Sequence, residues 1–312
     1  MKLVIQIPCF NEEGTLKTTL DALPAHICGI DEIEVLVIND GSSDRSEETA
    51  LEEGAKVISF KRNLGLARAF EAGLKTSLAM GADIIVNLDA DNQYCADDIE
   101  KLIEPILLKK ADIAIGTRPI ENIKHFSPVK KILQKMGSFV MKKVSGADVD
   151  DAPSGFRAFS AHAARRINIF DNYTYTLETI IQAQRKGLSI TCVPIRVNEE
   201  LRPSRLVKNN FDYIRRSIFT MLRIFIIYRP FRFFISLGIF VFILALLPAL
   251  RFLWFYLTGQ GSGHVQSLIL CAILMIISFL CGLLAIISDL LAINRKLLED
   301  VQVTLREMKN SK

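Results

Sequence analysis

This chain of 312 residues contains six cysteines, and no two of them are close enough in sequence to suggest a metal-binding pair. They stand at positions 9, 28, 95, 192, 271 and 281. Zinc sites and disulfide-rich folds use cysteines at short, regular spacings. The scattered pattern argues against a cysteine-based metal site and predicts reduced cysteines that act as packing residues in a protein facing the cytosol.

The first two hundred residues contain no internal repeat, no low-complexity tract and no Gly/Ser-rich linker. This absence predicts one continuous domain, residues 1–206. A signal peptide is not expected, because the apolar core of residues 1–8 is too short for one. The same residues are better suited to a first buried strand.

Charged residues are missing from two long stretches near the carboxyl end, residues 233–250 and 265–288. As a helix, the first stretch would be about 27 Å long, close to the roughly 30 Å hydrocarbon core of a bilayer. Hydrophobic residues make up 50% of the chain, which is high for a wholly soluble protein. The pattern predicts a hairpin of two transmembrane helices, residues 231–257 and 265–288.

Basic residues are concentrated before the first predicted span, whereas the connection at 258–264 is uncharged. Asp212 is the only acid between Arg202 and Arg232. By the positive-inside rule, this asymmetry predicts an integral membrane protein whose termini and large amino-terminal part face the cytoplasm. The net charge of +4 lies mainly beside the membrane, so we expect contact with anionic lipid and no nucleic-acid partner.

Two further segments have amphipathic patterns. Residues 207–230 are basic and aromatic, and predict a juxtamembrane helix in the membrane interface. Residues 289–312 predict a cytoplasmic carboxyl-terminal helix. Two interpretations of that helix stay open: it pairs with its copy in a homo-oligomer, a dimer or a tetramer, or it lies on the membrane as a solvated helix.

Short apolar runs alternate with helical patterns along the first domain. The predicted strands are residues 3–7, 34–38, 56–60, 84–88 and 113–115. The predicted helices are residues 12–23, 43–53, 64–80 and 97–108. Such alternation predicts an α/β fold, Rossmann-like, with a mostly parallel sheet and helices on both faces.

The most informative motif follows the predicted strand 84–88 and contains Asp89, Asp91 and Gln93. If the chain stays extended here, side chains two positions apart emerge on the same side, so three oxygen ligands lie together. Mg²⁺ and Mn²⁺ favour such ligands, and open α/β sheets bind substrates at the carboxyl ends of their strands. The alternative is a solvated acidic turn that caps a helix starting near Ala96.

Two other strand ends carry polar residues. Asn11 follows the first strand and is suited to cap the next helix, although an ordinary helix start has the same appearance. Asp40 follows the second strand, where its carboxylate is able to accept a hydrogen bond from a base or a ribose. Gly41 allows close approach of the backbone, although a plain turn would also contain such residues.

Taken together, six segments resemble glycosyltransferase family 2, the inverting nucleotide-sugar enzymes of the GT-A fold. They are residues 8–12 (PCFNE), 39–44 (NDGSSD), 63–65 (NLG), 89–93 (DADNQ), 116–118 (GTR) and 154–157 (SGFR). With its two-span tail, the chain resembles the polyprenyl-phosphate glycosyltransferase branch, which includes dolichyl-phosphate mannose synthase and bacterial glucosyl relatives. It departs from the family at Asn39, where an Asp is frequent, and at residues 199–205, which replace an Arg-x-x-Gly-x-Ser-Lys loop.

The resemblance implies a metal-dependent hexosyltransferase and assigns roles to particular residues. Mg²⁺ or Mn²⁺ would be held by Asp89, Asp91 and Gln93. The nucleotide-sugar would contact Pro8, Phe10, Asn11, Glu12, Asp40, Gly41, Ser42, Asp89 and Ala90. Catalytic roles fall to Asp91, Arg118, Arg202 and Arg205. The acceptor phosphate would contact Arg118, Lys130, Lys131, Arg157 and Ser204.

The implied reaction transfers a sugar, with inversion, from a UDP- or GDP-sugar to undecaprenyl or dolichyl phosphate at the cytoplasmic membrane face. A sugar hydroxyl needs a general base, whereas a phosphate monoester with a second pKa near 6 is already mostly dianionic at neutral pH. No histidine lies in a matched segment, which favours a phosphate acceptor. Two alternatives stay open: a membrane glycosyltransferase that adds one sugar to a hydroxyl of a lipid-linked glycan, and a non-catalytic membrane scaffold.

Overall fold

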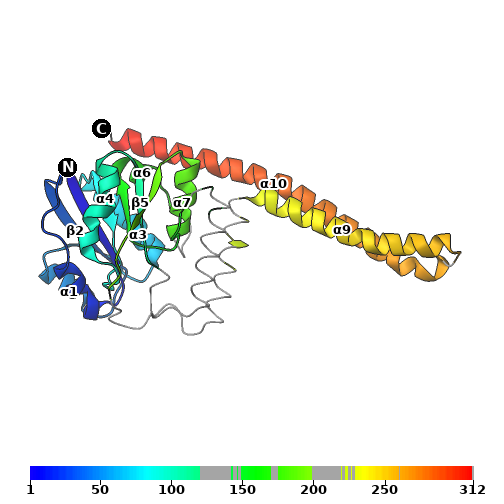
Figure 1. Cartoon of the computed structure of the whole chain (residues 1–312), viewed down its shortest axis with the longest axis horizontal. Helices are drawn as coiled ribbons and strands as arrows, with labels where there is room; N and C mark the ends of the chain where they lie inside the picture. Colours follow the sequence, from blue (N-terminus) through cyan, green and yellow to red (C-terminus); the bar gives the residue numbers. More distant parts are fainter. Residues whose placement is uncertain are drawn as a thin grey trace. The chain divides into compact units, whose positions relative to one another are not determined.

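The computed structural model describes residues 1–119, 149–169, 175–198, 229–259 and 261–310, together with a few single positions between these ranges. The chain divides into two compact units, Met1–Ser217 and Ile218–Lys312, and each is described by itself. Figure 1 shows the elements of both units.

The first unit is an α/β domain with a seven-stranded sheet in the order β3-β2-β1-β4-β6-β5-β7. The strands are β1 (Lys2–Cys9), β2 (Glu32–Asn39), β3 (Lys56–Ser59), β4 (Ile84–Asn87), β5 (Ile113–Thr117), β6 (Arg157–Ser160) and β7 (Ile190–Pro194). β6 runs antiparallel to both of its neighbours, and the other neighbouring strands are parallel. The mostly parallel sheet confirms the predicted fold class.

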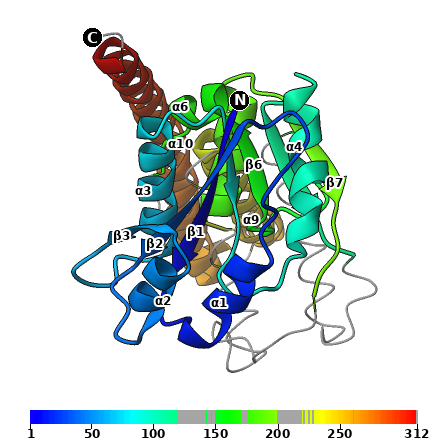
Figure 2. The ribbon, with the colours of Figure 1, turned by 90° about the vertical axis from the view of Figure 1, so that its left-hand side faces the viewer.

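The helices of this unit connect the strands and cover the sheet. They are α1 (Glu13–Asp21), α2 (Ser46–Glu52), α3 (Leu66–Ala79), the 3-10 helix η1 (Ala96–Asp98), α4 (Ile99–Leu107), α6 (Ala161–Arg166) and α7 (Tyr175–Arg185). Figure 2 shows α3 and α4 on opposite sides of the sheet, so helices cover both faces as predicted.

Alternation along β1 explains the two layers of core. Leu3 and Ile7 point to the face that is covered by Leu16 of α1 and Leu102 of α4. α4 presents buried apolar residues at positions 99, 102, 103 and 106, which is the spacing of one helix face. On the other face of the sheet, Phe70 of α3 stacks on Tyr175 of α7 with ring centroids 3.8 Å apart. The sheet is therefore buried between two helical layers.

All nine elements predicted up to residue 115 are present, with ends that differ by a few positions. The sequence patterns predicted none of β6, α6, α7 and β7. The predicted juxtamembrane helix, residues 207–230, lies almost entirely outside the described residues.

The second unit is a helical hairpin of α9 (Pro230–Leu257), the 3-10 turn η3 (Gly261–His264) and α10 (Val265–Asn310). α9 and the first 31 residues of α10 are each long and apolar enough to cross a membrane. Only 11% of the most apolar window of each helix is buried. α10 continues without a break across residue 288, so the second predicted span and the predicted carboxyl-terminal helix form one helix as far as Asn310.

Small residues line the contact between α9 and α10. Gly238 and Ala245 of α9 are buried, as are Cys281 and Ala285 of α10. The Ser278 hydroxyl donates a hydrogen bond to the Gly238 carbonyl oxygen at 2.9 Å. Small side chains allow two helix backbones to approach closely, which is how helices associate in lipid.

Candidate active site

The carboxyl ends of β1, β2 and β4 lie beside one another at one edge of the sheet. Cys9 at the end of β1 pairs with Asn39 at the end of β2, and Gln6 of β1 pairs with Asn87 at the end of β4. The segments that follow these strands therefore meet at the edge where open α/β sheets bind their substrates. Most of the predicted site residues belong to these segments.

Hydrogen bonds in both directions join the segments after β1 and β2. The Asn11 N–H donates to Ser42 Oγ at 3.0 Å, and the Asn11 Oδ1 accepts the Ser43 N–H at 2.8 Å. The Glu12 N–H donates to Ser46 Oγ at 2.8 Å. Asn11 makes these contacts with a φ of 54°, and the N-cap position of α1 belongs to Glu12. The predicted capping role of Asn11 is therefore wrong, and Asn11 instead joins the two loops.

Two predicted nucleotide contacts at the end of β1 differ in their exposure. Pro8 is buried within the strand, whereas the Phe10 ring is 42% exposed at the start of the loop.

The Ala90 carbonyl oxygen, in the loop after β4, lies 3.0 Å from Thr15 Oγ1 and 3.1 Å from Thr19 Oγ1. α1 therefore supports the loop after β4 as well as the loop after β1.

Asp40 is buried beneath the loop that follows β3. Its carboxylate accepts the N–H of Leu64 at 2.7 Å and the N–H of Gly65 at 2.9 Å. Burial raises the pKa of Asp40, and these two hydrogen bonds partly offset that effect. Gly41 has a φ of 70°, and a Cβ atom there would lie 2.5 Å from the Arg62 carbonyl carbon. Only glycine fits this close approach between the two loops.

The loop that carries Asp89, Asp91 and Gln93 is a turn rather than extended chain. β4 ends at Asn87, and residues 90–92 turn with Asn92 at a φ of 55°. The predicted extended alternation of the three side chains is therefore wrong, although they belong to one tight loop in which Asp91 Oδ1 accepts the Gln93 N–H at 3.2 Å. The capping alternative is not supported, because η1 starts after residue 95 without a side-chain cap.

The electrostatics of this loop suit a divalent cation. Burial and the negative charge of Asp91 raise the pKa of Asp89 to about 7, although Arg118 and Arg157 act in the opposite direction. Among the residues that the structure describes, no three His, Cys, Asp or Glu side chains form a closed metal cage. Mg²⁺ typically uses one or two carboxylates together with substrate phosphates, so two adjacent carboxylates and one amide oxygen fit such an ion.

Arg118 lies at the end of β5 and is held by Asp151. Its Nε donates to Asp151 Oδ2 at 2.7 Å and its Nη2 to Asp151 Oδ1 at 2.9 Å. The Arg118 side chain is 8% exposed and that of Asp151 is inaccessible. The bidentate pair with Asp151 fixes the Arg118 guanidinium. It lies close enough to Asp89 to stabilise the negative charge of the Asp89 carboxylate. Arg118 keeps a small exposed surface, and its predicted contact with phosphate stays a prediction.

Arg157, at the start of β6, is completely buried. Its guanidinium donates to the carbonyl oxygens of Ala152, Ser154 and Thr176 at 2.6–2.8 Å and to Thr179 Oγ1 at 2.6 Å. Burial lowers the pKa of Arg157 to about 10, so the group stays charged at neutral pH. The prediction that Arg157 contacts the acceptor phosphate is wrong in this structure, because no part of its side chain reaches the surface.

Five predicted site residues lie outside the described residues. They are Lys130, Lys131, Arg202, Ser204 and Arg205.

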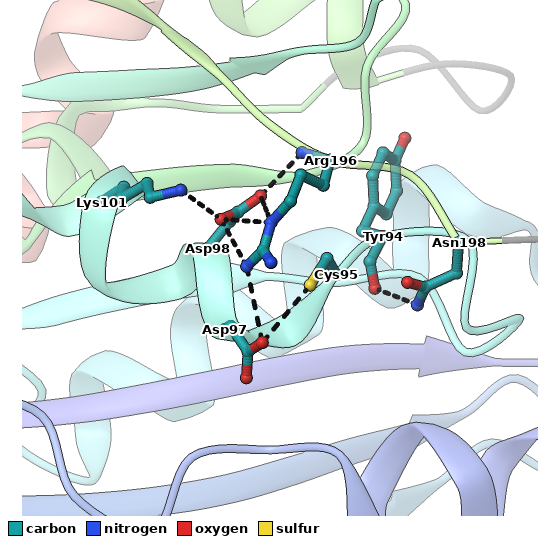
Figure 3. A network of polar contacts seen from close by, with 7 residues as sticks. All are labelled: Tyr94, Cys95, Asp97, Asp98, Lys101, Arg196 and Asn198. Atoms are coloured by element: carbon teal, nitrogen blue, oxygen red, sulfur yellow. Dashed lines mark hydrogen bonds and ion pairs between the residues drawn. The ribbon is translucent and has the colours of Figure 1, made fainter.

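A polar cluster that the sequence motifs did not indicate fastens the loop after β4 to the segment after β7 (Figure 3). Asn198 Nδ2 donates to the carbonyl oxygen of Asn92 at 3.0 Å and to that of Tyr94 at 3.1 Å. Arg196 binds the Asp98 carboxylate through its backbone N–H at 2.7 Å and through its guanidinium. The partners are about a hundred positions apart, so no local pattern reveals the cluster. The carboxyl-terminal part of the loop and the start of η1 are thereby held to the segment after β7.

A mostly parallel α/β sheet with an acidic loop at the carboxyl end of a central strand is the arrangement of the GT-A fold. The chain belongs to glycosyl transferase family 2, whose family model matches residues 4–167. Among its relatives, the UDP-N-acetylglucosamine–dolichyl-phosphate N-acetylglucosaminyltransferase of Methanococcus voltae is 32% identical over 213 residues, which cover 61% of this chain and 83% of that protein.

The undecaprenyl-phosphate mannosyltransferase of Micrococcus luteus is also similar, with 28% identity over 222 residues that cover 66% of this chain and 88% of that protein. Among solved structures, glucosyl-3-phosphoglycerate synthase of Mycobacterium tuberculosis, in complex with Mn²⁺, UDP and glucosyl-3-phosphoglycerate, matches with a TM-score of 0.57 at 20% identity. That match covers 72% of this chain and 78% of the other chain, and it shows a common fold.

Proposed function

We propose that this chain transfers a sugar, with inversion, from a nucleotide-sugar to undecaprenyl or dolichyl phosphate at the cytoplasmic face of a membrane. The observation that carries the proposal is the presence, in one chain, of a family 2 glycosyltransferase domain and two helices long and apolar enough to cross a bilayer. A lipid acceptor is confined to the membrane, so anchoring an enzyme there keeps its active site close to that acceptor. Relatives named for dolichyl-phosphate and undecaprenyl-phosphate transfer support the same acceptor.

The chemistry of a phosphate acceptor agrees with the groups at the site. A phosphate monoester is mostly dianionic at neutral pH, so the attacking oxygen needs no base to remove a proton. None of the four histidines lies in one of the six segments that resemble the family. The enzyme must instead place two phosphate-bearing substrates together, which requires positive charge. Arg118, and beyond the described residues Lys130, Lys131, Arg202 and Arg205, are the cations proposed for that role.

Asp89, Asp91 and Gln93 would hold Mg²⁺ or Mn²⁺ together with the donor diphosphate. When bound, the ion stabilises the negative charge that develops on the departing nucleotide. We expect substitution of Asp91 to damage the site, because it would remove one of the two carboxylates proposed to hold the ion. Phe10 offers an exposed ring for the base, and the loops at Asp40 and Ser42 would surround the ribose.

The membrane orientation rests on the sequence pattern of basic residues before α9 and the uncharged turn between the two helices. We expect the turn at 258–264 to face the side opposite to both termini. A cysteine placed at Gly261 in a variant without native cysteines should react with an impermeant maleimide from outside intact cells. A cysteine at Lys2 should be protected there, and the reverse pattern would contradict the orientation.

Transfer from a panel of radiolabelled UDP- and GDP-sugars to undecaprenyl and dolichyl phosphate tests the function. The detergent-purified chain should form a chloroform-soluble, acid-labile product with Mg²⁺ or Mn²⁺, and EDTA should abolish it. Asp91→Asn should lower the rate at least a hundredfold. Asp97→Asn, which changes an exposed carboxylate in η1, should leave the rate within twofold. Transfer only to lipid-linked glycans would favour a hydroxyl acceptor, and no transfer at all would favour a scaffold.

A further inference from the structure

Gly155 lies directly against the carboxylate of Asp89. A Cβ atom at position 155 would lie 2.7 Å from Asp89 Oδ2 and 2.8 Å from Asp89 Oδ1. Both carboxylate oxygens therefore rest on the Gly155 backbone, and only glycine leaves room for them. Gly155 is part of the short segment that leads into β6, far from Asp89 in sequence.

The Gly155 peptide is held from both sides by buried side chains. Its N–H donates to the Tyr94 hydroxyl oxygen at 3.1 Å, and its carbonyl oxygen accepts Asn87 Nδ2 at 2.9 Å. Tyr94 is 2% exposed and Asn87 is inaccessible. Both residues flank Asp89 in the chain, so the strand and loop that carry Asp89 also grip the backbone on which its carboxylate rests.

Each of these two side chains is itself fixed. The Tyr94 ring stacks on Phe156 with centroids 5.2 Å apart, and its backbone carbonyl accepts Asn198 Nδ2, as Figure 3 shows. Asn87 Oδ1 accepts Gln6 Nε2 at 2.9 Å. The buried hydrogen bonds from Gln6 to Asn87, from Asn87 to Gly155 and from Gly155 to Tyr94 favour one arrangement of these groups.

We infer that Tyr94 and Asn87 are positioning residues for Asp89: through Gly155 they fix the direction of its carboxylate toward a bound divalent cation. The inference rests on the proposed role of Asp89 as a ligand for that cation. Groups that orient metal ligands typically change metal affinity by about 10- to 100-fold when they are removed. Tyr94 would orient the Asp89 carboxylate without touching the ion, through its hydrogen bond with the Gly155 N–H.

Direct Mn²⁺ binding to the full-length, detergent-purified chain tests the inference. Free Mn²⁺ is measured by electron paramagnetic resonance during titration, with UDP present and, separately, with GDP. Tyr94→Phe removes only the hydroxyl and keeps the ring stack, and Gly155→Ala forces the carboxylate aside. Each variant should raise the Kd for Mn²⁺ at least fivefold, and excess Mn²⁺ should restore the transfer activity of Tyr94→Phe. Ser189→Ala is the matched control, because it removes a 2.7 Å hydrogen bond to Asp112 at the amino ends of β5 and β7.

The control should keep its Kd for Mn²⁺ within twofold of the unchanged protein. Equal Kd values for the unchanged protein, Tyr94→Phe and Gly155→Ala would overturn the inference while leaving the proposed metal site intact. Loss of fold in both variants would overturn it in favour of a purely structural role. No Mn²⁺ binding by the unchanged protein would overturn the proposed metal dependence and the inference with it.

Discussion

Arg196 binds Asp98 across 98 positions of sequence and closes the loop after β4 onto the end of β7. The Arg196 backbone N–H donates to Asp98 Oδ2 at 2.7 Å, and its Nη2 donates to Asp98 Oδ1 at 3.0 Å. Lys101 Nζ also donates to Asp98 Oδ1, at 2.9 Å. Burial alone would raise the pKa of Asp98, but the hydrogen bonds from Arg196 and Lys101 outweigh it and lower the pKa to about 2. The pair therefore stabilises the folded catalytic unit.

Asp98→Asn tests this contribution and its pH dependence. The folded-state pKa of Asp98 lies below the roughly 3.9 of an unfolded aspartate, so the stabilisation is present above about pH 4 and is lost as the pH falls toward 2. After allowance for the exposure of Arg196 to water, Asp98→Asn should destabilise the catalytic unit by about 1 to 2 kcal/mol at pH 7. The difference from the unchanged protein should shrink toward zero at pH 2 in chemical denaturation followed by circular dichroism.

Asp97→Asn is the control for that measurement. Asp97 lies 3.4 Å from the same guanidinium but is 75% exposed. Exposed ion pairs contribute little, so its loss should change stability by less than about 0.5 kcal/mol. An equal loss in the two variants would show that burial of Asp98 is not what makes the pair stabilising.

The amino-terminal half of the sheet was predictable because each of its strands is a largely apolar run. All of β4 and nearly all of β1 are buried, and the helices between the strands carry apolar residues at helical spacing. β6 was not predictable, because it begins with Arg157. An arginine normally indicates exposure, and here it is buried because the carbonyl oxygens of Ala152, Ser154 and Thr176 and the Thr179 hydroxyl accept its hydrogen bonds.

The site was predictable as a set of strand ends, but its internal contacts were not. Sequence order places Asp40 and Asp89 after buried strands, and parallel pairing then brings those strand ends to one edge. The turn at Asn92, the support of Asp89 by Gly155 and the anchoring of Tyr94 by Asn198 all depend on long-range packing. Local patterns carry no information about such partners.

Gly41→Ala should damage the nucleotide end of the site. The substitution combines a left-handed backbone, which costs about 1 to 2 kcal/mol for a residue with a Cβ, with a collision against the Arg62 backbone that adds roughly 1 to 3 kcal/mol. Donor KM should rise and thermal stability should fall. Gly54→Ala is the matched control, because Gly54 has a similar φ of 77° and open space around its Cβ position. Gly54→Ala should lose only the stability that the left-handed backbone costs, and its KM for the donor should be unchanged.

Asn39→Asp restores the residue that is frequent in the family, and we expect it to be harmful here. Asn39 Nδ2 donates to Glu47 Oε2 at 2.9 Å and to Ser59 Oγ at 3.3 Å, while its Oδ1 accepts the Ser42 N–H. A buried carboxylate in its place would oppose Glu47 without a donor between them, at a cost of about 2 to 3 kcal/mol. The melting temperature in detergent should fall. Adding Glu47→Gln should recover most of the loss, since glutamine supplies an N–H; no recovery would rule out this explanation.

The last prediction concerns the contact between α9 and α10. It compares a larger side chain placed in that contact with one placed where there is open space. A Cβ at Gly238 would lie 3.3 Å from both Cys281 Cβ and the Ser278 carbonyl oxygen, whereas a Cβ at Gly282 meets nothing within 4 Å. Gly238→Leu should push the helices apart, break the Ser278 hydrogen bond and cost about 1 to 3 kcal/mol. Thermal unfolding in detergent should show a clear loss for Gly238→Leu and almost none for Gly282→Leu. Similar losses in the two variants would mean that this small-residue contact does not hold the helices together.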